Sequence, residues 1–364
     1  GAAGRKGIFM IDASKGFIKD GNKNRLRAQD IHKIVDTFTR QLETPKYSRM
    51  VPLAEIKAND FNLNLPRYID STEPEDVQDI AAHLKGGIPN ADIDGLSAYW
   101  RVFPSVRREL FANADRPGYS QPKVESSQIK AAIFAHPEFT AFNQTVTALF
   151  GTWKAANTPL LTGIKQGDRP KLLIEKLAEN LLATFRSSEA IASLIDPYAI
   201  YQHLMDYWAE TMQDDAWMIA SDGWVATGNG RNNTDLIPPA LIVARYYAAE
   251  QATIEQREAK RDAFSRQMEE MDEEHGGDEG LLNDARNDKG KLTAKSVKDR
   301  LKAIKGDKEA ADERKLLDAY AALIEQGAAA SKAVKDAQKA LDPQVAARYA
   351  KLTEAEIKAL VVQD

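Results

Sequence analysis

The feature that most constrains the fold is a pair of long, charged helical segments in the last third of the chain. The first is Ile237–His275, ended by Gly276 and Gly277, and the second runs over about Thr293–Leu341. An irregular, glycine-containing stretch joins them. Dense charge with a narrow apolar stripe is typical of a two-stranded antiparallel coiled coil. The sequence predicts such a coiled coil, with the second arm broken at Pro343.

The N-terminal part follows a different pattern. Gly7–Ser14 is an apolar run that predicts a buried strand, and Asp30–Phe38 has apolar residues at helical spacing, with Asp30 as a candidate N-cap. Asn59–Asp70 alternates apolar residues with asparagines, which predicts a half-buried strand. The apolar members are Phe61, Leu63 and Leu65. Strand, helix and strand form an α/β pattern that is too short for a whole domain, so we expect the trailing end of one.

Between these parts the sequence predicts helices. Expected segments, read from spacing and capping residues, are a capped helix from Glu73 to Gly86, then Ile93–Phe111, Ser126–Ala135, Phe139–Thr152 and Pro170–Phe185. An aromatic stripe follows from Tyr198 to Trp208, where core packing is favoured over a cofactor box. The predicted fold class is therefore α+β, mostly α. Its expected division is residues 1–72, a helical domain at 73–235 and a coiled-coil region at 236–364.

Composition narrows the function classes. Apolar content of 43% with 28% charged residues fits a soluble globular protein, and the net charge of -5 gives no overall reason to bind nucleic acid. The first 50 residues nevertheless carry 11 Lys and Arg against 5 Asp and Glu. Such a local basic patch can contact phosphate; the alternative is an ordinary solvated face. No apolar run approaches a membrane span, and a cytoplasmic protein is expected.

Several kinds of chemistry have no support in the sequence. There is no cysteine, which excludes disulfides, thiol nucleophiles and Cys-ligated metals, and the five histidines show no metal-site spacing. The Gly-x-Gly at Gly228–Gly230 lies in a polar loop and follows no strand, unlike a nucleotide-binding turn. Asp214 and Asp215 form the best isolated acidic pair, and a helix-end turn is favoured over an acid–base dyad. We therefore predict no catalytic, cofactor-binding or metal-ligating residue in this chain.

Three stretches resemble the end of the modification subunit of type I restriction–modification systems: GIFMIDASKGF, NRLRAQDIHKIVDTF and YSRMVPLAEIKANDFNLNLPRYID. Asn62–Tyr68, which reads Asn-Leu-Asn-x-Pro-Arg-Tyr, is the most specific of these matches. DPYAIYQHLMDYWAETMQDDAWMI, DLIPPALIVARYYAAEQATIE and KLTEAEIKALVV resemble the long C-terminal extension of one branch of that family. Residues 118–165 carry little of the resemblance.

The resemblance implies a part of an adenine-N6 DNA methyltransferase that uses S-adenosylmethionine. Its catalytic Asn/Asp-Pro-Pro-Tyr/Phe motif has no counterpart here, since Pro238 and Pro239 have different neighbours, and the glycine-rich cofactor motif is also missing. The chain is therefore expected to be the C-terminal part of such a subunit, with a remnant of the methyltransferase domain at residues 1–72. The family's partners would be a specificity subunit, a restriction subunit, a second modification subunit and double-stranded DNA, with no membrane.

Two sets of residues are candidates for interfaces. The first set would face the helical tail or DNA: Asn62, Asn64, Arg67 and Tyr68. An equal alternative is that the two amides only satisfy local backbone at a sheet edge. Ile357 and Leu360 would form an uncovered apolar stripe that docks on the specificity subunit; the alternative is that they fold back on the chain. The competing function is a stand-alone helical scaffold or adaptor with no part in methylation.

Overall fold

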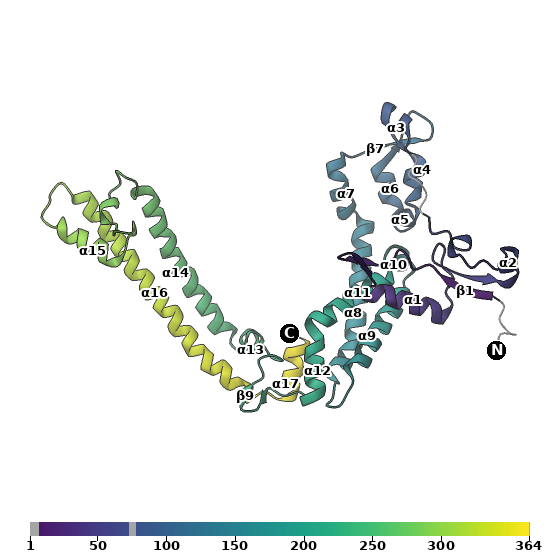
Figure 1. Ribbon diagram of the computed structural model, residues 1–364. Helices are drawn as coiled ribbons and strands as arrows, with labels where there is room; N and C mark the ends of the chain where they lie inside the picture. The colour runs from purple at the N-terminus through teal and green to yellow at the C-terminus, as the bar shows by residue number, and fades with distance from the viewer. Residues whose placement is uncertain (1–6, 73–77, 364) are drawn as a thin grey trace. The chain divides into compact units, whose positions relative to one another are not determined.

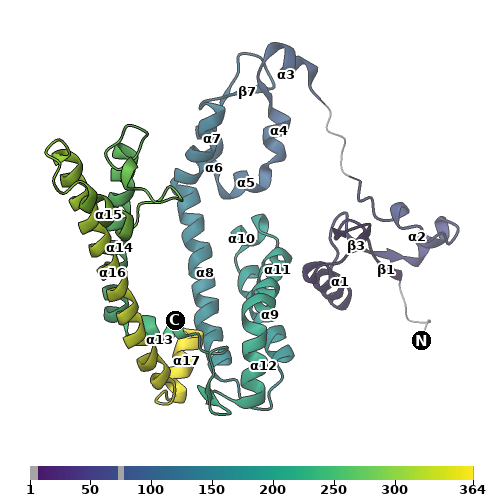
Figure 2. The ribbon, with the colours of Figure 1, turned by 60° about the vertical axis from the view of Figure 1, so that its left-hand side comes forward.

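The computed structural model describes residues 7–72 and 78–363, which are shown in Figures 1 and 2. The chain divides into two compact units, Gly1–Ser221 and Asp222–Asp364, which are described separately here. Helices dominate both units, and the strands are few and short. The α+β, mostly α, fold class is therefore confirmed.

The first unit opens with a small α/β segment. Its elements are β1 (Gly7–Ile11), β2 (Ile18–Asp20), β3 (Lys23–Arg25), α1 (Ala28–Arg40), β4 (Ser48–Pro52) and α2 (Leu53–Ala58). β1 and β4 pair antiparallel with Ile8 opposite Val51, and β2 and β3 form a separate hairpin. A small core joins the β1–β4 sheet to the residues that follow α2: Met10, Val51, Ile56, Tyr68 and Ile69. The predicted strand and helix are thus present, although α1 begins at Ala28 and Asp30 lies inside its first turn.

The predicted strand at Asn59–Asp70 is wrong. Asp60 and Phe61 have φ angles of 52° and 57°, a left-handed turn that cannot continue a strand. A short 3-10 helix, η2 (Leu65–Arg67), follows the turn. Phe61 and Leu63, expected to pack on the sheet, are 63% and 53% exposed. Alternation at period two therefore misled the prediction, because the backbone reverses direction within the alternating stretch.

The rest of the first unit is helical apart from one small sheet. Its first group of elements is α3 (Ile80–Lys85), β5 (Ile88–Pro89), α4 (Asn90–Gly95), α5 (Ser97–Val102), α6 (Pro104–Leu110), β6 (Phe111–Asn113), β7 (Tyr119–Pro122), η3 (Ser126–Gln128) and α7 (Ile129–Ala135). The strands pair in the order β5-β7-β6. Phe103, Val106 and Leu110 form the core of this group. The predicted helix ends at Gly86 as expected; its start at Glu73 lies outside the described residues.

A second group of longer helices completes the first unit. These are α8 (Pro137–Thr162), α9 (Pro170–Arg186), α10 (Glu189–Leu194), α11 (Pro197–Tyr207), the π-helical turn η4 (Trp208–Met212) and α12 (Gln213–Asp222). α9 packs on both α8 and α11, as Figure 2 shows. Of the predicted aromatic stripe, Tyr198, Leu204 and Trp208 are buried. The stripe is therefore part of the helical core.

The second unit contains β8 (Thr227–Gly228), β9 (Arg231–Asn232), α13 (Pro239–Tyr246), α14 (Ala248–His275), η5 (Asn283–Ala285), α15 (Ala294–Ala303), α16 (Ala311–Tyr349) and α17 (Glu354–Val362). The Gly-x-Gly stretch forms a β8–β9 hairpin, in which Asn229 and Gly230 both have positive φ angles. Asn-Gly is the preferred pair for such a turn. The turn of this hairpin therefore accounts for the Gly-x-Gly stretch, and no nucleotide-binding role is needed to explain it.

The two long helices α14 and α16 lie side by side and run antiparallel (Figure 1). Near the start of α14 the Tyr247 hydroxyl donates to the Gln344 carbonyl, and further along Arg257 donates to the Ala333 carbonyl. The helix boundaries differ from the prediction at three places. Tyr247 separates α13 from α14, and the second arm is divided between α15 and α16. Pro343 lies inside α16 and does not end it.

The stretch that connects the arms is more ordered than predicted. η5 and α15 fold onto the ends of α14 and α16 around a separate core. Its buried members are Leu282, Ala285, Val297, Ile304, Leu317 and Tyr320. Arg300 strengthens this end by donating to Glu313 from its Nε atom at 2.6 Å. The far end of the helix pair is therefore a packed tip.

Candidate functional site

The structure divides the first set of predicted interface residues. Tyr68 is only 5% exposed, and its hydroxyl donates to the Asn62 carbonyl, so it is a core residue and does not face a neighbour. The Asn62 Oδ1 atom accepts from the backbone N–H of Asn64 at 3.0 Å, which is the local backbone role given above as the alternative. Asn62, Asn64 and Arg67 are exposed. The four residues therefore do not share one outward face.

The expected uncovered stripe on the last helix is covered by the chain itself. Ile357 is 2% exposed and Leu360 is fully buried. α17 is held in place by Glu356, which accepts from the Tyr246 hydroxyl of α13 and from the Arg348 guanidinium of α16. The prediction of an exposed stripe is wrong because both side chains are buried in the folded chain.

Glu356 also completes the cap of α17. Its Oε2 atom accepts from the backbone N–H and the hydroxyl of Thr353, at 2.8 and 2.9 Å. These bonds, with the Tyr246 hydroxyl and the Arg348 charge, outweigh burial and lower the pKa of Glu356 to about 2 from an ordinary 4.5. A carboxyl with a lowered pKa stabilises the fold above its ordinary value, and this contribution is lost as the pH falls through the lowered value.

We therefore expect the Glu356 carboxyl to stay ionised down to a pH of about 2. A pH titration of its side-chain carbon signal by NMR would measure this. In the Thr353→Val variant, which lacks the hydroxyl donor, the midpoint should move upward. An unchanged midpoint in that variant would show that the cap does not set the pKa.

A polar cluster that the sequence did not indicate joins α1 to the helices α9 and α11. The Asp36 Oδ2 atom accepts from the Arg186 Nη2 atom and from the Tyr198 hydroxyl, both at 2.7 Å. Arg40 approaches the other carboxylate oxygen at 3.4 Å. The Asp36 side chain is 12% exposed. We call Asp36, Arg186 and Tyr198 the α1 joint.

Further contacts surround the α1 joint. The His32 ring stacks on Tyr201 with centroids 4.3 Å apart, and the Gln29 backbone N–H donates to the Gln202 side-chain oxygen at 3.0 Å. Lys33 lies over the Tyr47 ring at 4.5 Å. These contacts occupy one face of α1. The joint therefore fixes the α/β segment against the helical part of the first unit.

The electrostatics of the α1 joint favour a charged carboxylate. Burial alone would raise the pKa of Asp36, but the hydrogen bonds from Tyr198 and Arg186 outweigh it and lower the pKa. Burial and the bond to Asp36 raise the pKa of Tyr198, so the phenol stays protonated. Burial lowers the pKa of His32. These shifts are typical of a structural ion pair. Each of the three residues of the joint is hydrogen-bonded to the other two.

The β2–β3 hairpin carries three of the exposed basic side chains of the N-terminal region. Lys19, Lys23 and Arg25 are exposed on it. Arg25 pairs with Asp20 at 3.3 Å, and the Lys19 ammonium donates to Asn24 at 2.8 Å. The positive charge therefore exceeds the negative charge on this hairpin, which suits contact with phosphate.

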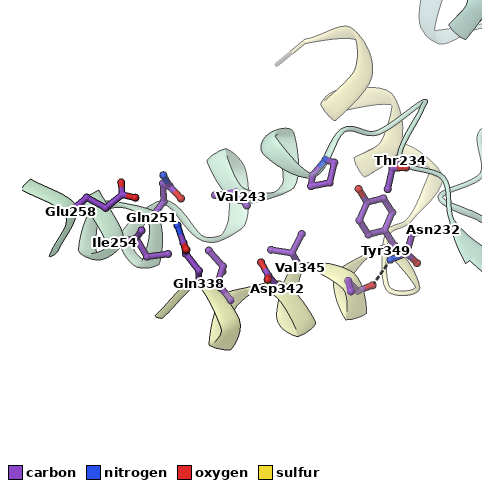
Figure 3. A pocket seen from close by; sticks show the side chains of 13 residues that line it. Asn232, Thr234, Val243, Gln251, Ile254, Glu258, Gln338, Asp342, Val345 and Tyr349 are labelled. Atoms are coloured by element: carbon purple, nitrogen blue, oxygen red, sulfur yellow. Dashed lines mark hydrogen bonds between the residues drawn. The ribbon is translucent and has the colours of Figure 1, made fainter. Parts of the chain in front are cut away.

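A pocket of about 550 Å³ lies where α13 and α14 meet α16 in the second unit (Figure 3). The Tyr349 hydroxyl donates to the Ile237 carbonyl beside it at 2.6 Å, and the Asn232 amide donates to the Ala346 carbonyl at 3.0 Å. Glu258 and Asp342 bring carboxylates to its lining. Among the described lining residues there is no His, Lys or Arg. The lining offers no nucleophile paired with a base.

Two further properties apply to residues 7–72 and 78–363. Within these ranges, no three His, Asp or Glu side chains gather closely enough to hold a metal ion. None of the helices described there is both long and apolar enough to cross a membrane.

Comparison with known proteins places the N-terminal segment. Residues 2–77 match the N-6 DNA methylase family. The methylase subunit of the type I restriction enzyme MpnII from Mycoplasma pneumoniae is 32% identical over 73 residues, 20% of this chain and 13% of the relative. The methylase subunit of the type I restriction enzyme MjaVII from Methanocaldococcus jannaschii is 38% identical over 85 residues, which are 22% of this chain and 15% of the relative.

These matches cover only a small part of each relative, about one seventh of its length or less. No solved structure matches the chain. The matched segment includes all the elements from β1 to α2. Asp36 of the α1 joint, which lies on α1, is therefore part of it. Over residues 2–77 the chain is thus similar to the N-6 DNA methylase family and, within it, to methylase subunits of type I restriction enzymes.

Proposed function

We propose that this chain is the C-terminal portion of the modification subunit of a type I restriction–modification adenine-N6 methyltransferase. Its role there is subunit assembly and clamping of DNA. The observation that carries the proposal is the match of residues 2–77 to the N-6 DNA methylase family, with type I methylase subunits as relatives. S-adenosylmethionine would be the cofactor of the complete subunit.

We also propose a division of labour along the chain. Residues 1–72 would be the edge of the methylase domain, residues 73–235 a helical domain, and residues 236–364 the region that docks on the specificity subunit. The antiparallel α14–α16 pair supports the last assignment, because it presents two long charged helices and a packed tip to a partner. We propose that it is a coiled coil.

DNA contact would come from the exposed basic hairpin. Lys19, Lys23 and Arg25 lie in the matched segment, and their charge would steer the duplex by contacting phosphates. Such contacts position a protein on DNA without reading its sequence. The specificity subunit would read the target, and the restriction subunit and a second modification subunit would complete the assembly.

We expect no saturable binding of S-adenosylmethionine by the 364-residue chain alone. The reason is that neither a glycine-rich turn after a strand nor the catalytic proline motif occurs in its sequence. Isothermal titration calorimetry would measure the binding. One-site binding at micromolar ligand would contradict this account of the chain as a part without the cofactor site.

The proposed function itself is tested with the polypeptide that the complete gene encodes. Together with the specificity subunit of its own system, it should transfer radiolabelled methyl groups to adenine in duplex DNA. The 364-residue chain should co-purify with the specificity subunit without methylating DNA. The competing function, a stand-alone scaffold, predicts neither methylation by the complete gene product nor co-purification, so that pair of results would overturn the proposal.

A further inference from the structure

The helix α1 carries an apolar stripe that the described residues of the first unit leave exposed. Ile31, Val35 and Phe38 are 51%, 55% and 65% exposed. Their spacing of four and three residues places them on one face of the helix. A stripe of this kind on an amphipathic helix normally faces a core. The exposed face of α1 is therefore an unusual feature of the first unit.

The covered face of α1 is the polar one. His32 stacks on Tyr201 and Asp36 bonds to Arg186 of α9, which leaves the apolar stripe on another face. The α1 joint therefore accounts for how α1 is held but not for why the helix has an apolar stripe. No contact described within the first unit accounts for the stripe.

The sheet beside α1 is also incomplete. β1 and β4 form a two-stranded sheet within the described residues, and Ile8 on β1 is 41% exposed. Two strands alone are marginal, and a sheet usually has more. In an α/β domain the apolar face of a helix packs on a larger sheet. An uncovered stripe and a short sheet in one segment point to the same missing neighbour.

We propose that the remaining part of an N-6 DNA methylase domain covers Ile31, Val35 and Phe38 and extends the β1–β4 sheet. This rests on the proposed function. The family match includes α1, β1 and β4, and about six sevenths of each relative lies beyond the aligned segment. A second copy of the chain is a weaker occupant, because three side chains are far short of the roughly 800 Å² per partner of a stable interface.

The absence of native cysteine allows a direct test. Val35→Cys places one thiol in the stripe, and Lys298→Cys places one at an exposed position on α15 as a control. The rate of maleimide labelling is measured for the 364-residue chain and for the polypeptide that the complete gene encodes. We expect Val35→Cys to react at least about tenfold more slowly in the longer polypeptide and Lys298→Cys to react equally in both.

Three results would overturn the proposal. One is an equal labelling rate of Val35→Cys in the two polypeptides. Another is concentration-dependent protection in the 364-residue chain, which would identify a second copy as the cover. The third is a gene that encodes no further methylase domain. Methyl transfer by a longer polypeptide whose Val35→Cys thiol stays reactive would leave the proposed function standing and reject only this surface.

Discussion

Leu360→Asp is expected to destabilise the second compact unit by about 4 kcal/mol or more. Leu360 is fully buried on α17, so the substitution removes a large apolar side chain and places a carboxyl group where it has no water. Few single changes have a larger effect than a charge in a core. Hydrogen exchange followed by mass spectrometry would measure the loss as faster exchange in α16 and α17.

A matched control lies five residues earlier on the same helix. Ala355 is exposed in the first turn of α17, and a negative charge there suits the helix dipole. Ala355→Asp should therefore change stability by less than about 0.5 kcal/mol. If Leu360→Asp exchanged no faster than this control, the burial of α17 would be wrong and the docking stripe would again be the better explanation.

Local signals in the sequence were sufficient for the end of α3. Asp79 caps α3 and Gly86 follows its last turn, so the predicted end is observed. They were insufficient where the chain turns without a glycine: Asp60 and Phe61 adopt left-handed angles inside an alternating apolar pattern. Pro343 gave the opposite error: it predicted a break in the helix, but α16 continues past it. The spacing of apolar residues carries no information about the backbone angles at these positions.

The candidate site was less predictable than the fold. Asp36 contacts residues 150 and 162 positions away, and nothing in the sequence links them. The stripe of α1 was visible as helical spacing, but its exposure depends on which elements surround it. For Ile357 and Leu360 the spacing was also correct, while the cover proved to be the chain itself. In each case the residue pattern predicted which face of the helix is apolar, but not which element packs against that face.

Asp36→Ala is expected to lower the free energy of unfolding of the first unit by about 2–3 kcal/mol at neutral pH. The change removes the acceptor shared by Arg186 and Tyr198 and leaves a partly buried guanidinium without its counter-charge. Asp20→Ala is the matched control. It removes an ion pair whose side chains are 63% and 65% exposed, and such pairs contribute about 0–1 kcal/mol. Urea unfolding followed by circular dichroism would measure both.

The effect of Asp36→Ala should also depend on pH, because the pKa of Asp36 is lowered in the folded chain. A lowered carboxyl pKa adds stability that is complete above the ordinary value, and that stability is lost as the pH falls through the lowered pKa. The gap between the parent chain and the variant should be constant from neutral pH down to about pH 5, and it should close in stronger acid. A gap that persisted unchanged in strong acid would mean that lost packing, and not the charge of Asp36, holds α1 against α9 and α11.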